Sequence, residues 1–204
     1  MNQAERPCLW AVIAALLLWS AWSCKTAGQD DDEDEAALPR LTCVPYVSAD
    51  DVYFYRQFEP GHGGIDLTAT REIAIRAMCP GTFNKKLYYH PESLRWQVNC
   101  EILVGDYAVD YLFEPGSQVT EAQGRLQFDK LVADGSQVSA GELLGSLTLA
   151  PGNDVTLLHF GVRYRPANRT ECPLKYATAE VQAQLQALAQ RDHPGWQPCT
   201  IDAP

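Results

Sequence analysis

Short apolar runs separated by turn signals are the feature that most constrains the fold of this chain. From Leu41 onward, residues that favour turns interrupt the sequence at 61–64 (GHGG), 80–81 (PG), 114–116 (EPG), 134–135 (DG) and 151–152 (PG). Such punctuation is typical of strands joined by turns. The apolar runs predict strands over residues 52–58, 73–77, 82–89, 96–104, 107–113, 143–149 and 155–164. We therefore expect a mainly β domain over residues 41–204.

One segment has helical periodicity instead. Thr178 is suited to the N-cap position, and Val181, Leu185 and Leu188 fall on one face of a helix. This pattern predicts a single helix, over residues 178–190, near the end of the chain.

The first 40 residues have a different character. Residues 9–22 (LWAVIAALLLWSAW) form an apolar run of 14 residues, whereas a membrane-spanning helix needs roughly 20. The core of a signal peptide fits better. Residues 21–24 (AWSC) resemble a bacterial lipobox, which predicts a signal peptide over residues 1–23, a lipid on Cys24 and a membrane-anchored protein of the cell envelope. Ordinary secretion, into the medium or the periplasm, and an uncleaved anchor remain the alternatives.

The formal net charge of −10 is unevenly distributed. Residues 1–40 carry three basic and seven acidic groups, a charge of −4, and the remaining 13 basic and 19 acidic groups give −6. The acidic run at 30–35 predicts an extended, flexible tether over residues 24–40, with an acidic metal-binding tail as the alternative. The negative balance argues against a nucleic-acid partner, which requires a basic face.

The seven cysteines indicate an oxidising compartment. Cys8 lies in the signal segment and Cys24 at the lipobox, so five thiols remain for the domain, and an odd number leaves at least one unpaired. Two disulfides are expected, although the connectivity stays open. Cys172 and Cys199 bracket the predicted helix, and Cys79 and Cys100 lie on neighbouring predicted strands.

Three side chains are candidates for a metal site. His62 and Asp66 are four residues apart in a glycine-rich segment, and in an extended chain both point to one side. His159 lies in a predicted strand on the face opposite Leu158 and Phe160. Two imidazoles and a carboxylate are three ligands of a catalytic zinc, with the fourth position left for water. On spacing alone, surface histidines remain the alternative, and His90 and His193 are expected to be such surface groups.

Four segments together resemble the lysostaphin/LytM-like zinc endopeptidases. They are residues 62–67 (HGGIDL) for the H-x-x-x-D motif, 73–83 (IAIRAMCPGTF) for the following strand, 132–145 (VADGSQVSAGELLG) for a glycine hairpin and 157–160 (LLHF) for the H-x-H-F strand. The order and spacing agree from about Gly61 to Val162. The resemblance implies a sandwich-like antiparallel fold of the duplicated hybrid motif type. It also implies a zinc ion held by His62, Asp66 and His159, and peptides of peptidoglycan as substrates.

The sequence departs from the family pattern at its catalytic histidines. Leu157 stands at the first histidine of H-x-H, and Phe113, in residues 111–114 (YLFE), stands at the histidine of the family's Y-x-H-L strand. A placement near Leu126 recovers no histidine either. Glu114 is a substitute base, although it should face away from the position of Phe113. Tyr111 and Arg163 are substitute donors to an oxyanion.

Three hypotheses follow. The leading one is an envelope lipoprotein that keeps the zinc triad, has lost its catalytic histidines, and binds peptidoglycan peptides or regulates an envelope partner. The second is an active zinc endopeptidase that cleaves peptidoglycan cross-links with a rearranged proton shuttle. The third is a structural lipoprotein whose triad binds no metal.

Overall fold

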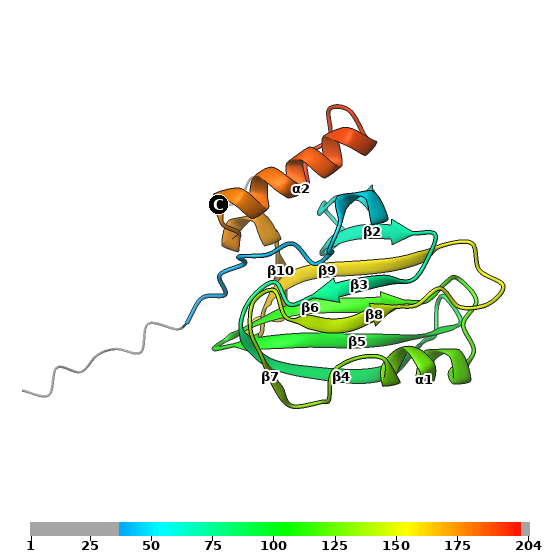
Figure 1. Ribbon diagram of the computed structural model, residues 1–204. Coiled ribbons are helices and arrows are strands. Elements are labelled where there is room, and N and C mark those ends of the chain that lie inside the picture. Colours follow the sequence, from blue (N-terminus) through cyan, green and yellow to red (C-terminus); the bar gives the residue numbers. More distant parts are fainter. Residues whose placement is uncertain (1–36, 201–204) are drawn as a thin grey trace, which may run out of the picture. The chain divides into compact units, whose positions relative to one another are not determined.

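A single large antiparallel sheet organises the domain (Figure 1). The computed structural model describes residues 37–200. Strand order in the sheet is β1-β2-β9-β6-β5-β4-β7, with β10 added beside β9, and β3 pairs with β8 in a separate two-stranded sheet. The strands are β1 (Tyr53–Arg56), β2 (Ile65–Ala69), β3 (Ile73–Arg76), β4 (Gly81–His90), β5 (Arg95–Val104), β6 (Tyr107–Glu114), β7 (Ser136–Val138), β8 (Leu143–Leu147), β9 (Thr156–Tyr164) and β10 (Arg169–Glu171). The predicted mainly β, antiparallel fold class is confirmed.

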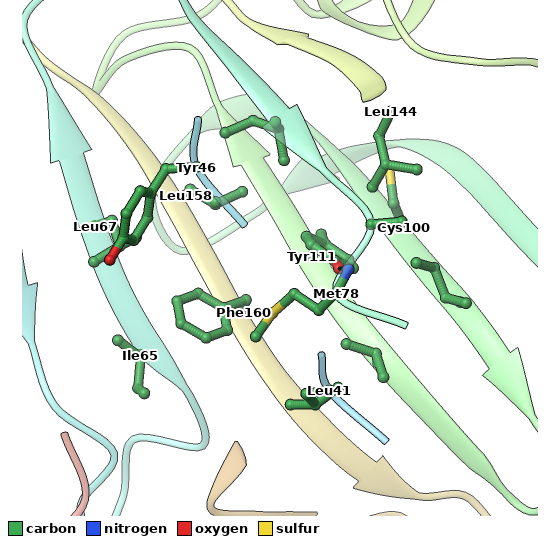
Figure 2. Packing of buried hydrophobic residues seen from close by; sticks show 14 of the residues in the cluster. Leu41, Tyr46, Ile65, Leu67, Met78, Cys100, Tyr111, Leu144, Leu158 and Phe160 are labelled. Carbon is green, nitrogen blue, oxygen red and sulfur yellow. Dashed lines mark hydrogen bonds between the residues drawn. The ribbon is translucent and has the colours of Figure 1, made fainter. Parts of the chain in front are cut away.

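The core lies on one face of the large sheet. Alternate residues of neighbouring strands point to this face, among them Leu67 of β2, Phe160 of β9 and Tyr111 of β6, all of them buried (Figure 2). The pair β3–β8 contributes Ile75 and Leu144 to the same cluster. Because the side-chain period of a strand is two, the opposite face of β2, β9 and β6 is left for polar side chains, and the candidate metal ligands lie there.

A helix that the sequence pattern did not predict, α1 (Glu121–Asp129), follows β6. Its Thr120 and Gln123 form a capping box, which satisfies free backbone groups at the helix start. Gly124 permits close packing on β5, since a Cβ there would lie 2.9 Å from Trp96 Cβ. The buried positions of α1 are Gly124 and Gln127, so it has no apolar stripe to signal a helix.

The second helix, α2 (Ala179–Asp192), agrees with the prediction. Thr178 is the N-cap, and Val181, Leu185 and Leu188 are buried. The helix lies between Cys172 and Cys199, which form the predicted disulfide. The residues on either side of Cys199 bond to the backbone of Phe58. The Phe58 amide donates to the Pro198 carbonyl at 2.9 Å, and the Thr200 amide donates to the Phe58 carbonyl at 3.0 Å.

Loss of this disulfide is the first testable consequence. The bridge closes a loop with a sequence separation of 27, for which the chain-entropy model gives about 3–4 kcal/mol of stabilisation. We expect Cys199→Ser to lower the free energy of unfolding by that amount in urea titrations under non-reducing conditions. Cys43→Ser, at a free thiol, is the control. Equal stability of the Cys199→Ser variant and the unmodified protein would contradict the role given to the bridge.

The predicted bridge between Cys79 and Cys100 is wrong: both are buried free thiols. The prediction assumed that Cys79 and Cys100 lie on neighbouring strands. Instead β3 pairs with β8 outside the large sheet, and Cys79 lies in the connection between β3 and β4, whereas Cys100 lies on β5. Burial raises the pKa of the Cys79 thiol to about 12, which makes it a poor nucleophile.

Glu171 is a carboxylate whose charge stabilises this end of the fold. Burial alone raises its pKa, but hydrogen bonds from Tyr176, Arg169 and Lys175 outweigh burial and lower the pKa to about 2. A lowered folded-state pKa contributes stability above the unfolded value near 4.5, and this contribution is lost as pH falls toward 2.

A pH titration checks this effect. We expect Glu171→Gln to lower the free energy of unfolding at neutral pH by about 2–3 kcal/mol and to flatten its decline between about pH 5 and pH 2. Parallel unfolding curves of the two proteins across that window would refute it. Glu142→Gln is a matched control at an exposed glutamate.

Some predictions fall outside the described residues. The signal peptide over 1–23, the lipid on Cys24 and all but the last four residues of the tether over 24–40 lie there. Within residues 37–200, the two helices are too short and too polar to span a membrane.

Candidate metal centre

The structure brings the three candidate ligands together at the junction of two neighbouring strands. His62 lies on the loop between β1 and β2, Asp66 lies on β2 and His159 lies on β9. Asp66 and His159 are direct cross-strand partners. Their face of the sheet is opposite the core, as predicted for His159.

The ligand atoms are already close to coordination distance. His159 Nδ1 lies 2.7 Å from Asp66 Oδ1, and His62 Nε2 lies 3.0 Å from Asp66 Oδ2. All three ligand atoms lie within 4.8 Å of one another. Tetrahedral zinc with bonds of about 2.0–2.2 Å separates its ligand atoms by about 3.4 Å, a separation that lies between the Asp66 contacts and the 4.8 Å limit. Among residues 37–200 no other such group of metal-ligating side chains occurs.

The hydrogen bond behind His62 fixes the state of its ring. His62 Nδ1 lies 2.8 Å from the carbonyl oxygen of Gln57, and since a carbonyl only accepts, Nδ1 carries the hydrogen. In the neutral ring, Nε2 then presents a lone pair to Asp66 Oδ2. Two acceptors at 3.0 Å need either a proton on Nε2 or a cation between them. This donor set, with its outer carbonyl, fits zinc.

Two glycines make room for the site. A Cβ on Gly64 would collide with the imidazole ring of His159, and a Cβ on Gly161 would lie 2.8 Å from the Gly63 carbonyl oxygen. Glycine at these positions therefore allows the loop carrying His62 to lie directly against β9. The sequence offered this signal in residues 62–67, where the second glycine of the motif is Gly64.

Leu157 is on the metal face, and Phe113 is not. Leu157 precedes His159 by two residues on β9, and its half-buried side chain shares that face. Phe113 pairs with Leu158 and is fully buried on the core face. The side chain of Phe113 therefore cannot reach the metal site, because successive residues of a strand point to opposite faces.

The residues of β6 that do face the metal site are Leu112 and Glu114. Leu112 pairs with His159, and Glu114 pairs with Leu157. Glu114 is 7% exposed and forms an ion pair with Arg95. Burial raises the pKa of Glu114, Arg95 acts in the opposite direction, and the nearby Asp66 adds to the rise. Glu114 faces away from Phe113, as expected, and because Phe113 lies on the core face, Glu114 lies on the metal face, opposite Leu157.

The two predicted oxyanion donors are engaged elsewhere. The Tyr111 hydroxyl accepts a hydrogen bond from the Met78 amide at 2.8 Å in the core. Arg163 is on the metal face, but it donates to Asp110 at 2.8 Å and to Glu101 at 2.9 Å. Neither side chain is free to stabilise a developing negative charge beside His159.

A polar pocket of about 350 Å³ continues the metal face across β6, β5 and β4. Leu112, the partner of His159, is on its near wall, and Asn99, Asn84 and the Arg163–Asp110 pair lie farther along. Sequence reasoning did not find this pocket, because its residues come from four strands and only the register brings them together.

The other two histidines of the described part lie apart from the triad. His90 ends β4, where its Nδ1 accepts from the Ser93 amide at 3.3 Å. His193 caps the end of α2 and stacks on Trp196, with ring centroids 4.0 Å apart.

Comparison with known proteins gives likenesses among solved structures only. No family model matches this sequence, and no curated protein matches it. The chain is similar to a mutant catalytic domain of the prophage-encoded M23 protein EnpA from Enterococcus faecalis, with 20% identity, a TM-score of 0.44, and coverage of 65% of this chain and 96% of that one. It is also similar to a zinc containing peptidase from Vibrio cholerae, with 18% identity, a TM-score of 0.37, and coverage of 67% of this chain and 38% of that one. At such identities and TM-scores the likenesses carry no conclusion about activity, so the functional interpretation depends on the chain's own residues.

Proposed function

We propose that this protein is a zinc-binding, LytM-like domain anchored in the cell envelope through a lipid on Cys24. In this proposal it binds peptides of peptidoglycan, or an envelope protein that it regulates, and hydrolyses peptide bonds weakly or not at all. The single observation that carries the proposal is the preformed His62–Asp66–His159 group, with the His62 tautomer set by the Gln57 carbonyl.

The polar pocket supplies the means to hold a peptide beside the triad. Asn84 and Asn99 offer both donors and acceptors to a peptide backbone. The guanidinium of Arg163 is already paired with both Asp110 and Glu101, so it does not act as a free positive charge toward a peptide. A bound zinc ion would polarise a peptide carbonyl at the near end of this pocket.

Weak hydrolysis follows from what surrounds the triad. A positioned acid or base contributes roughly 10²–10⁴-fold to a rate, and an oxyanion donor about 10²–10³-fold. Leu157 can do neither, while Tyr111 and Arg163 are held by other partners. The residues therefore favour binding over turnover.

A second candidate function, a zinc endopeptidase, is favoured by one observation. The β6–β9 register places Glu114 opposite Leu157 on the metal face. A carboxylate there, with its pKa raised by burial, is suited to take a proton from water and return it to a leaving amine. Its ion pair with Arg95 would have to open for this role.

Zinc content and peptidoglycan cleavage, measured together on the purified full chain in detergent, separate these functions. Stoichiometric zinc without release of peptides from cell-wall sacculi supports the binding function. Zinc-dependent cleavage that Glu114→Gln abolishes and Glu92→Gln leaves intact supports the endopeptidase. Failure to retain zinc at any concentration would exclude both and leave a metal-free structural lipoprotein.

A further inference from the structure

A second open groove, of about 850 Å³, lies at the turn between β4 and β5 and beside the start of α1. Tyr89, Leu94 and Trp96 come from the β4–β5 hairpin, and Gln118, Thr120 and Pro151 come from the segments around α1 and before β9. None of its lining residues is among the metal ligands or in the polar pocket beside them. Its size is in the range of small-molecule sites.

The lining of the groove combines aromatic, hydroxyl and amide side chains and contains no charged residue. The start of α1 does not make it an anion site, because the capping box of Thr120 and Gln123 already satisfies backbone groups there. The ligand chemistry that complements such a lining is neutral, with apolar faces and many hydroxyl or amide groups.

An aromatic pair forms one wall. Tyr89 and Trp96 are cross-strand partners whose ring centroids lie 5.4 Å apart at an interplanar angle of 51°. Tyr89 is 42% exposed. The negatively charged face of an aromatic ring attracts polarised C–H groups, and a pyranose ring presents a row of them on each face.

Backbone strain marks the same wall. Leu94 has a φ of 52°, in the left-handed region that a leucine rarely adopts, yet its side chain is 72% exposed beside the aromatic pair. Strain of this kind persists where the surrounding structure or a function holds it. The neighbouring Ser93 Oγ is buried and has no hydrogen-bond partner among residues 37–200.

The opposite wall is held rigidly. The side chain of Asn153 accepts from the Gln118 amide at 3.1 Å and donates to the Gln118 carbonyl at 3.1 Å. The Trp96 amide donates to the Val119 carbonyl at 3.1 Å, which ties this wall to the aromatic one. The exposed Gln118 side chain is thereby presented from a fixed backbone, and such preorganisation lowers the cost of binding.

We propose that this groove binds a neutral oligosaccharide of pyranose rings, one ring stacking on the Tyr89–Trp96 pair and its equatorial groups bonding to the side-chain amide of Gln118. The site goes beyond the proposed zinc function and needs no metal.

Calorimetric titration of the full chain with chitotetraose, a neutral β-linked tetramer of N-acetylglucosamine, tests the proposal. We expect saturable binding that Tyr89→Ala weakens about tenfold. Leu94→Gly should also weaken it, and this variant is compatible with the native φ, so loss of folding does not account for the result. Tyr55→Ala is the matched control, since Tyr55 is an exposed tyrosine on β1. His159→Ala should leave the affinity unchanged, which separates this site from the metal centre.

Three results would overturn the proposal. The first is the absence of chitotetraose binding. The second is an affinity for chitotetraose in the Tyr89→Ala and Leu94→Gly variants that equals that of the unmodified protein. The third is that the groove binds a neutral peptide instead. In that case both variants weaken the binding of tetraalanine and leave the binding of chitotetraose unchanged.

Discussion

His159→Ala is expected to cost the protein its zinc. His159 is one of the three proposed ligands found among residues 37–200, and its removal leaves Asp66 with a single imidazole partner at 3.0 Å. Changes to residues outside the coordination shell already lower metal affinity by about 10–100-fold, so loss of a ligand should exceed about a hundredfold. Competition with a chromogenic chelator gives the affinity directly. Thermal unfolding gives a second readout, because a ligand that binds only the native state raises its stability.

His90→Ala is the matched control for this prediction. The imidazole of His90 lies at the end of β4 and contacts Ser93 rather than the triad. We expect the zinc affinity of the His90→Ala variant, and its zinc-dependent rise in melting temperature, to equal those of the unmodified protein. If His159→Ala retains full affinity, the ion is held elsewhere and the metal centre assigned here is incorrect.

Much of the sheet could be predicted from the sequence because local signals define it. Turn residues at 80–81 and 114–116 bound the long strands β4 and β6, and the predicted ranges match them within one or two residues. The signal for α2 is equally local, since Thr178 and three apolar residues at helical spacing predict the helix. These elements depend on neighbours in the chain rather than on distant contacts.

The parts that were missed depend on long-range packing. α1 buries Gly124 and Gln127, which have no apolar signature, and the glutamine is satisfied by the Ser146 carbonyl and the Thr148 amide. The short strands β2, β7 and β10 form because a neighbouring strand offers hydrogen bonds. Nothing in residues 73–83 indicates that β3 leaves the large sheet for β8.

The site shows the same division. The triad was visible as a motif, because His62 and Asp66 are close in sequence and His159 lies in a recognisable strand. The identity of the residue facing Leu157 was not visible, since it depends on the register between β6 and β9. Phe113 was the candidate from the sequence, but it faces the core, and Glu114 is the residue of β6 that pairs with Leu157.

Gly64→Ala is expected to disable the metal centre without removing a ligand. The added Cβ would collide with the imidazole of His159 and would lie 2.7 Å from the Phe160 carbonyl oxygen. Either the ring rotates away from Asp66 or the loop carrying His62 moves off β9. We expect the free energy of unfolding to fall by about 1–3 kcal/mol, as for other overpacked sites. Zinc affinity should fall by at least the 10–100-fold seen when support of a ligand is lost.

Gly61→Ala separates this steric effect from a general loss of stability. Gly61 lies in the same motif and has a φ of +83°, but a Cβ there would meet nothing within 4 Å. Its cost is conformational, about 1–2 kcal/mol, and comparable to that of Gly64→Ala. The two variants should therefore differ in zinc affinity far more than in stability, because only one displaces the His159 ring. Equal zinc affinity in both would show that the close approach of Gly64 to His159 does not govern the metal centre.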